Sequence, residues 1–173
     1  AVDLCQDTTS AVNACCNCTP ATPVVPCGQQ TGFKGGQAYP TERTVTLGSA
    51  TGRVRIDFNA KAIPDRFIIE FDGAIVVDSK YRGNMGQINA LHTALQAGNF
   101  TEPNNGVYTG HTYIGASTGA ADAPLPDPLD ATYFVSGKGT LFFDKSTATT
   151  TATLKVYGPM TNTEWNATIS CPT

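Results

Sequence analysis

The sequence has little charge, since Asp, Glu, Lys and Arg make up only 14% of its 173 residues, against roughly 25% in a typical soluble domain. Its 11 Lys and Arg and 14 Asp and Glu give a net charge of −3, without the basic cluster that phosphate binding requires. We therefore expect no nucleic-acid partner. Hydrophobic residues at 40% suffice for the core of one domain, leaving Thr, Ser, Asn and Gly to cover much of the surface.

Long hydrophobic runs are absent as well. No segment approaches the roughly 18 apolar residues of a membrane-spanning helix, so we expect no membrane span. The chain begins AVDLCQDTTS, without the charged and apolar regions of a secretory signal. Ala1 fits removal of a signal peptide and removal of an initiator Met equally well.

Recognisable catalytic motifs are missing. The sequence has no G-x-S-x-G, H-E-x-x-H, P-loop or Rossmann fingerprint. His92 and His111 have no evident nucleophile or metal partner in the sequence, and we interpret both as structural. Two carboxylates for glycoside hydrolysis could still converge in space without a sequence trace. We expect no enzymatic activity and assign no catalytic residue.

Cysteines are concentrated near the N-terminus. The six positions are Cys5, Cys15, Cys16, Cys18, Cys27 and Cys171. Their even number in a β-rich chain indicates disulfides and an oxidising compartment, although six cysteines allow fifteen pairings. A bridge from the N-terminal cluster to Cys171 would tie the two ends together.

Zinc and free thiols are the other interpretations of these cysteines. The segment CCNCTPATPVVPC offers four thiolates, but adjacent Cys15 and Cys16 fit poorly the C-x2-C pairs of structural zinc sites. Reduced thiols would suit a protein that assembles in a cytoplasm.

The chain divides into two regions. Residues 1–42 are rich in Cys, Pro, Gly, Thr and Gln and predict an extended arm, because repeated prolines favour extended backbone. Residues 43–173 predict a β domain. We expect the arm to pack on its own body or to mediate contacts with neighbouring subunits.

Short strands follow residue 43. RVRIDFN (53–59) alternates, with Val54, Ile56 and Phe58 on its dry face. The other single strands expected are RTVTL (43–47), ATYFVSG (131–137), GTLFFDK (139–145), ATLKVYG (152–158) and EWNATISC (164–171). In the last strand, alternation places Cys171 inward with Trp165. With a hairpin near residue 72, about eight strands predict an all-β, antiparallel β-sandwich or jelly-roll-like domain.

One helix is expected among the strands. In GQINALHTALQAG, Ile88, Leu91 and Leu95 have helical spacing, which predicts a short covering helix at about 86–97. Residues 99–130 are too rich in Pro, Gly and Asn for regular structure, apart from a short strand at VYTGHTYIG. We expect this irregular insertion to contact partners.

The stretch AIPDRFIIEFDGAIVVDSKYRG (62–83) predicts a hairpin with a type I′ turn at Asp72 and Gly73. The pairs expected across it are Phe71 with Ala74, Ile69 with Val76, and Phe67 with Asp78. Ile68, Ile75 and Val77 would then share a second apolar face. We predict that the helix, the arm or another subunit covers this face, and we take these three residues as subunit-contact candidates.

Calcium is the one cofactor that these residues suggest. Asp72 is roughly 16 Å of strand away from Asp65 and Asp78, so the three cannot share an ion. Asp65 and Asp78 lie at the same end of the hairpin and could share one calcium with carbonyl oxygens. An alternative function follows, a calcium-dependent glycan-binding or adhesion module. Tyrosines for stacking on cell-surface sugars would be Tyr108, Tyr113 and Tyr133.

Asn17, Asn99 and Asn166 head Asn-x-Ser/Thr triplets and are candidate glycosylation sites. About two such triplets are expected by chance in a chain this rich in Asn, Ser and Thr, so the signal is weak. Asn166 lies on the predicted outward face of its strand.

GRVRIDFNAKAIPDRFIIEFDGAIVVDSKYRG, followed by GKGTLFFDKS, TATLKVYGP and EWNATISCP, resembles a β-sandwich module of structural and appendage proteins of tailed phages and of bacterial surface proteins. The resemblance covers about residues 44–173, except 99–130. It implies a non-enzymatic subunit that assembles with copies of itself or with other proteins, outside the cell or in a virion. A phage tail, virion or decoration protein would carry reduced thiols, whereas a secreted filament subunit would carry oxidised ones.

Overall fold

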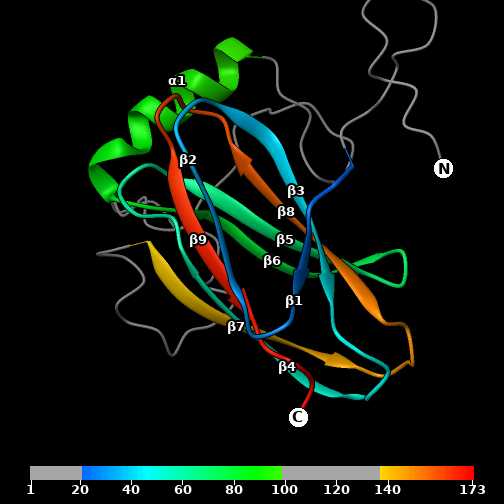
Figure 1. Ribbon diagram of the computed structural model, residues 1–173. Helices are drawn as coiled ribbons and strands as arrows, with labels where there is room; N and C mark the ends of the chain where they lie inside the picture. The colour runs from blue at the N-terminus through cyan, green and yellow to red at the C-terminus, as the bar shows by residue number, and fades with distance from the viewer. Residues whose placement is uncertain (1–20, 99–136) are drawn as a thin grey trace, which may run out of the picture.

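The computed structural model describes residues 21–98 and 137–173 (Figure 1). Its elements are β1 (Val24–Pro26), β2 (Gln30–Lys34), β3 (Ala38–Thr46), β4 (Gly52–Asn59), β5 (Asp65–Phe71), β6 (Ala74–Arg82), the 3-10 turn η1 (Met85–Gln87), α1 (Ile88–Gly98), β7 (Lys138–Lys145), β8 (Thr151–Gly158) and β9 (Glu164–Ile169). Sheet A has the strand order β1-β3-β8-β5-β6, and sheet B has the order β2-β9-β4-β7.

The two sheets pack face to face and enclose one core, which confirms the predicted β-sandwich (Figure 1). All strand pairs in the described ranges are antiparallel except β1 with β3. The largest core side chains include Trp165 on β9, Phe58 on β4 and Phe67 on β5, whose rings lie together. Burial of such aromatic residues is the main stabilising term of a sandwich of this size.

The alternating sequence of β4 explains its place in the sandwich. Val54 and Ile56 are fully buried, whereas Arg53 and Arg55 on the other face are exposed. Because successive strand residues point to opposite faces, this pattern gives sheet B one dry and one wet face, as predicted.

The hairpin of β5 and β6 turns where the sequence predicts. Asp72 and Gly73 have φ values of 50° and 77°, as a type I′ turn requires, and Phe71 pairs with Ala74. Beyond the turn the predicted register is wrong. Ile69 pairs with Val77 instead of Val76, because the ladder shifts by one residue between Ile69 and Glu70.

This bulge removes the predicted second apolar face. Ile68 remains on the face of β5 that points away from the core and is fully buried, while Val77 turns into the core. Ile75 stays 44% exposed near the turn. The three residues therefore do not form one surface, and of the three candidates Ile75 alone is open to a neighbouring subunit.

The predicted helix is confirmed as η1 and α1. Leu91 and Leu95 are fully buried and pack against Tyr81 of β6, with Tyr39 and Met160 at the margin. The helix thus covers one end of sheet A on the face opposite the main core (Figure 1). No helix in the part of the chain that the structure describes is long and apolar enough to cross a membrane.

The predicted arm boundary at residue 42 is wrong. Residues 24–26 and 30–34 are strands of sheets A and B, and residue 42 lies inside β3. Short, proline-flanked segments can serve as edge strands, which is why they show no long period. The strand predicted at 131–137 falls almost wholly outside the described residues, as does the insertion at 99–130.

Candidate functional site

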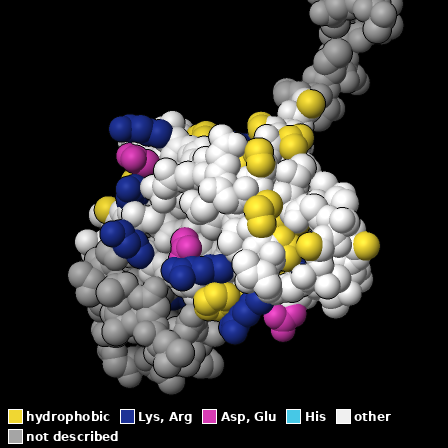
Figure 2. Space-filling model, turned by 60° about the horizontal axis from the view of Figure 1, so that its bottom comes forward, with side chains coloured by type: hydrophobic (Ala, Val, Ile, Leu, Met, Phe, Trp, Pro, Cys, Tyr) yellow, Lys and Arg dark blue, Asp and Glu magenta, His cyan; other side chains and the backbone are white. Residues whose placement is uncertain are grey.

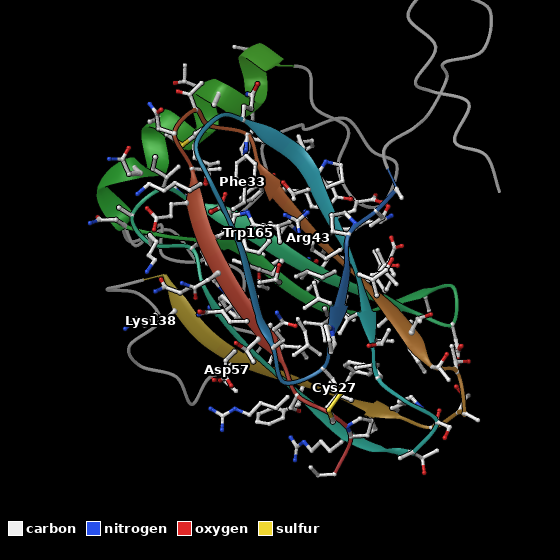
Figure 3. The ribbon with its side chains drawn as sticks, in the orientation of Figure 1. Cys27, Phe33, Arg43, Asp57, Lys138 and Trp165 are labelled. Atoms are coloured by element: carbon white, nitrogen blue, oxygen red, sulfur yellow. A yellow bond between two sulfur atoms is a disulfide. The ribbon has the colours of Figure 1, made fainter. Side chains whose placement is uncertain are left out.

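The outer face of sheet B is a polar surface with a defined arrangement. Its residues alternate with the core residues of the same strands. We call this surface the polar face, and its members are Gln30, Lys34, Arg53, Arg55, Asp57, Asn59, Lys138, Thr140, Phe142, Asp144, Glu164, Asn166 and Thr168. Figure 3 labels Asp57 and Lys138 on this side of the molecule and Trp165 between the sheets.

Asp57 lies at the centre of the polar face and orders its neighbours. Arg55 donates from Nε and one terminal nitrogen to both carboxylate oxygens, at 2.8–3.0 Å, and the Thr140 hydroxyl donates at 2.6 Å. Partial burial raises the pKa of Asp57, but hydrogen bonds from Arg55 and Thr140 outweigh it, so the pKa lies below its usual value. Asp57 is therefore ionised at neutral pH and holds the Arg55 guanidinium in one plane.

Phe142 and Arg53 form a second cluster beside this pair. Phe142 is 39% exposed, and the Arg53 guanidinium carbon lies 4.1 Å from its ring centroid, a cation–π contact. Asp144 is the cross-strand partner of Arg53. No ion pair links the two, and none joins Arg53 to another carboxylate of the described ranges. Arg53 therefore presents a guanidinium without an ion pair in the described residues next to an exposed ring.

The charges of the polar face are only partly paired. Lys34 lies 3.6 Å from Glu164, and Arg55 is bound to Asp57. Lys138 is exposed and has no ion-pair partner among the residues that the structure describes. Figure 2 shows Lys and Arg side chains beside exposed hydrophobic and acidic ones on the surface turned to the viewer.

Sheet A differs, because the charges on its outer side form closed networks. Lys155 lies 3.0 Å from Glu70 and 3.7 Å from Glu42. Asp78 accepts from Arg66 at 2.6 Å and from Lys80 at 2.5 Å. Burial raises the pKa of Asp78, but the hydrogen bond and charge of Arg66, followed by Lys80, lower it to about 2. These charges stabilise the sheet and leave little for a ligand.

The predicted calcium pair does not form. Asp65 is in step with the core residues Phe67 and Ile69 and is fully buried. Asp78 pairs with Ile68 and lies on the opposite face, bound to Arg66. No group of three or more His, Cys, Asp or Glu in residues 21–98 and 137–173 is placed to hold a metal ion.

Cys27 and Cys171 form a disulfide across 144 residues of sequence, which confirms the predicted bridge between the two ends. Cys27 lies between β1 and β2 and packs on the margin of the core. Cys171 is exposed, not inward as predicted, because β9 ends at Ile169 and its alternation stops there. The disulfide also rules out Cys27 as a zinc ligand.

Other predicted site residues fall outside the described parts. These are Cys5, Cys15, Cys16, Cys18, Asn17, Asn99, Tyr108, Tyr113, Tyr133 and His111, together with the side chain of His92. Asn166 lies on the outward face of β9 and is half-buried, opposite Gly32. Its glycosylation stays a prediction.

A shallow hollow of about 380 Å³ lies between α1 and the segment after β8. Its lining residues are Gln37, Ala94, Ala97, Pro159, Met160 and Thr161. None of them is an acid or a base, so the hollow offers no group for proton transfer.

The chain was compared with known proteins by sequence and by structure. No family model and no curated protein matches its sequence. The pre-peptidase C-terminal domain of a collagenase from Bacillus anthracis aligns with a TM-score of 0.42 and 6% identity, over 86% of this chain and 94% of that one. CorA of Methylomicrobium album BG8, a surface-associated copper-binding protein, aligns with a TM-score of 0.39 and 12% identity, over 88% and 100%. At this similarity neither protein's ligand nor its activity transfers to this chain.

Sequence reasoning missed the polar face. The outward positions Arg53, Arg55 and Asp57 follow from the alternation of β4, but their neighbours Thr140 and Phe142 come from β7, far along the chain. The pairing of β4 with β7 is a long-range contact that local sequence patterns do not predict.

Proposed function

We propose that this chain is a non-catalytic structural subunit of an extracellular assembly. In this assembly the cysteine-rich N-terminal segment, residues 1–20, links one copy to the next. The Cys27–Cys171 disulfide carries the proposal, because it uses both cysteines of the described residues. The other four cysteines can then pair only with each other or with cysteines of another molecule. They are Cys5, Cys15, Cys16 and Cys18.

The position of the disulfide suits a part that bears load. The N-terminal segment joins the body at β1, which adds three parallel pairs to β3, and Cys27 follows directly. A force on that segment passes through the disulfide to the C-terminal end of β9. A covalent link resists such a force better than three ladder pairs would.

The oxidised bridge also bears on the compartment. Disulfides form and persist outside the cytoplasm, which supports a secreted filament or surface subunit over a virion part assembled with reduced thiols. The phage alternative would need oxidation after assembly.

Asp65 and Asp78 have opposite pKa shifts but are not placed to act together as an acid and a base. A pair of carboxylates with divergent pKa values is the usual mark of acid–base catalysis. Burial raises the pKa of Asp65 well above its usual value, and Arg66 lowers that of Asp78, but the two lie on opposite faces of sheet A. The calcium-dependent glycan-binding alternative loses the same two residues, and we do not propose it.

Electrophoresis of protein made in an oxidising secretory compartment tests the proposal. We expect a ladder of multimers without reductant and a single monomer band with reductant. Replacing Cys5, Cys15, Cys16 and Cys18 by Ser should abolish the ladder. Cys27→Ser with Cys171→Ser is the matched control and should keep it. A wild-type protein that runs as a monomer under both conditions would contradict the proposal.

A further inference from the structure

We infer that the polar face of sheet B docks an acidic segment of a second copy, residues 122–130 (DAPLPDPLD), through Arg53, Lys138 and Phe142. The inference rests on the proposed assembly role and names a non-covalent contact for it. It concerns a different surface from the cysteine-rich segment.

The polar face is open and prepared for a carboxylate partner. The Arg55 guanidinium is already held by Asp57, while Arg53 and Lys138 are exposed and without an ion pair in the described part of the chain. Stacking on Phe142 fixes the guanidinium plane of Arg53 and leaves its N–H groups free to donate. Asp144 and Glu164 lie on the same face and limit its positive excess, so the partner must reach Arg53 and Lys138 specifically.

The sequence separates its charges in a complementary way. All 11 Lys and Arg lie in residues 21–98 and 137–173, together with eight of the 14 Asp and Glu. Residues 1–20 and 99–136 hold the other six acids and no Lys or Arg. The β-sandwich is therefore net positive and these segments are net negative, which favours contact between an acidic segment and the polar face.

Residues 122–130 match the face in chemistry as well as in sign. They hold Asp122, Asp127 and Asp130 with three prolines and two leucines. Proline-rich peptides dock on exposed aromatic rings, which suits Phe142. A free peptide of this kind favours a rise of about 3.1 Å per residue, which sets Asp122 and Asp130 roughly 25 Å apart. Lys138 on β7 pairs with Asn59 on β4, and Asn59 and Arg53 are roughly 20 Å apart along β4.

Titration with synthetic peptide 119–133 tests the contact. The titrated protein is the full chain with its four N-terminal cysteines replaced by Ser, so that covalent links are absent. We expect Arg53→Glu with Lys138→Glu to weaken binding about tenfold or more, since two attractive pairs become repulsive. The wild-type face should likewise bind a peptide with Asn at the three Asp positions about tenfold more weakly. A peptide with Lys at these positions should bind the charge-reversed protein and restore affinity.

Controls separate a site from general charge. Lys80→Gln removes the same charge from sheet A as Lys138→Gln removes from the polar face, and only the second should weaken binding. Equal binding by wild type and both variants would overturn the inference. So would binding of an acidic polysaccharide such as polygalacturonate, lost in the Arg53 and Lys138 variant, without binding of the peptide.

Sedimentation of the same full chain identifies the source of the segment. We expect weight-average mass to rise with protein concentration at low salt and to fall at high salt, because exposed ion pairs are screened. A protein that stays monomeric at all concentrations would exclude a second copy as the partner. If this contact fails while disulfide-linked multimers persist, the assembly role stands and the polar face is not part of it.

Discussion

The Thr163 hydroxyl lies 2.6 and 2.8 Å from the two carboxylate oxygens of Asp65, and both residues are fully buried. Asp65 begins β5, and Thr163 directly precedes β9, so this contact ties sheet A to sheet B at one end of the sandwich. Burial raises the pKa of Asp65 well above its usual value, and the hydrogen bond from Thr163 offsets only part of that.

Asp65→Asn should therefore stabilise the protein at neutral pH. A carboxyl whose pKa is raised on folding contributes stability that is complete below its unfolded pKa and is lost as the pH rises through its folded pKa. An amide has no charge to bury and can still accept from Thr163. Urea unfolding at pH 4 and pH 7 measures the free energy of unfolding of both proteins. The difference in favour of the variant should be larger at pH 7 than at pH 4. A variant that is less stable than wild type at pH 7 would contradict this account.

Asp78→Asn should act in the opposite direction. Because Arg66 and Lys80 hold the pKa of Asp78 at about 2, its ionised form stabilises the fold above its unfolded pKa, by about 2 kcal/mol. That stability is lost as the pH falls through about 2. At pH 7 the variant should unfold at a lower urea concentration than wild type. This difference in urea midpoint should become smaller as the pH is lowered. Asp144→Asn, on the exposed side of β7 and in no ion pair with the residues that the structure describes, is the matched control and should change little.

Lys145→Met should destabilise the end of the sandwich that is distant from α1. The buried Lys145 ammonium donates to the carbonyl oxygens of Ala50 at 2.7 Å and Thr147 at 2.6 Å, and so joins two loops. Removing the ammonium deprives both carbonyl oxygens of this donor, which should lower the free energy of unfolding by about 2–3 kcal/mol. Lys138→Met on the same strand is exposed and should cost less than about 0.5 kcal/mol. Equal losses in both variants would show that the Lys145 contacts contribute nothing specific.

Cys27→Ser with Cys171→Ser should lower the free energy of unfolding by about 2–5 kcal/mol, because the bridge closes a loop of 144 residues in the unfolded chain. Thermal unfolding of the double variant against reduced and oxidised wild type measures the effect. Reduced wild type should melt with the variant, and a variant as stable as oxidised wild type would refute this prediction.

Local patterns predicted the parts of the fold that local chemistry decides. Alternation in β4 and β8, the Asp72-Gly73 turn and the spacing of Leu91 and Leu95 all lead to the observed elements. The sequence does not predict the bulge near Val76, because the hydrophobic pattern of this hairpin is compatible with the strand register both with and without an extra residue.

Long-range partners were harder to predict. The sequence predicts a bridge to Cys171 but leaves five N-terminal cysteines as possible partners. Cys27 is the partner because it lies between β1 and β2, which belong to the two sheets. The polar face combines Arg53 of β4 with Phe142 of β7, a pairing set by strand order and not by sequence. Asp65 and Asp78 stood at the same end of a hairpin, yet the bulge and alternation place them on opposite faces.

Disulfide mapping by mass spectrometry of the secreted, unreduced protein tests the central claim most directly. In a mixture of unlabelled and ¹⁵N-labelled chains that were produced together, peptides containing Cys5, Cys15, Cys16 or Cys18 should appear in mixed-isotope pairs, which can only come from two molecules. The Cys27–Cys171 peptide should appear almost only as same-isotope pairs. Same-isotope pairs throughout would contradict the assembly role of the N-terminal segment.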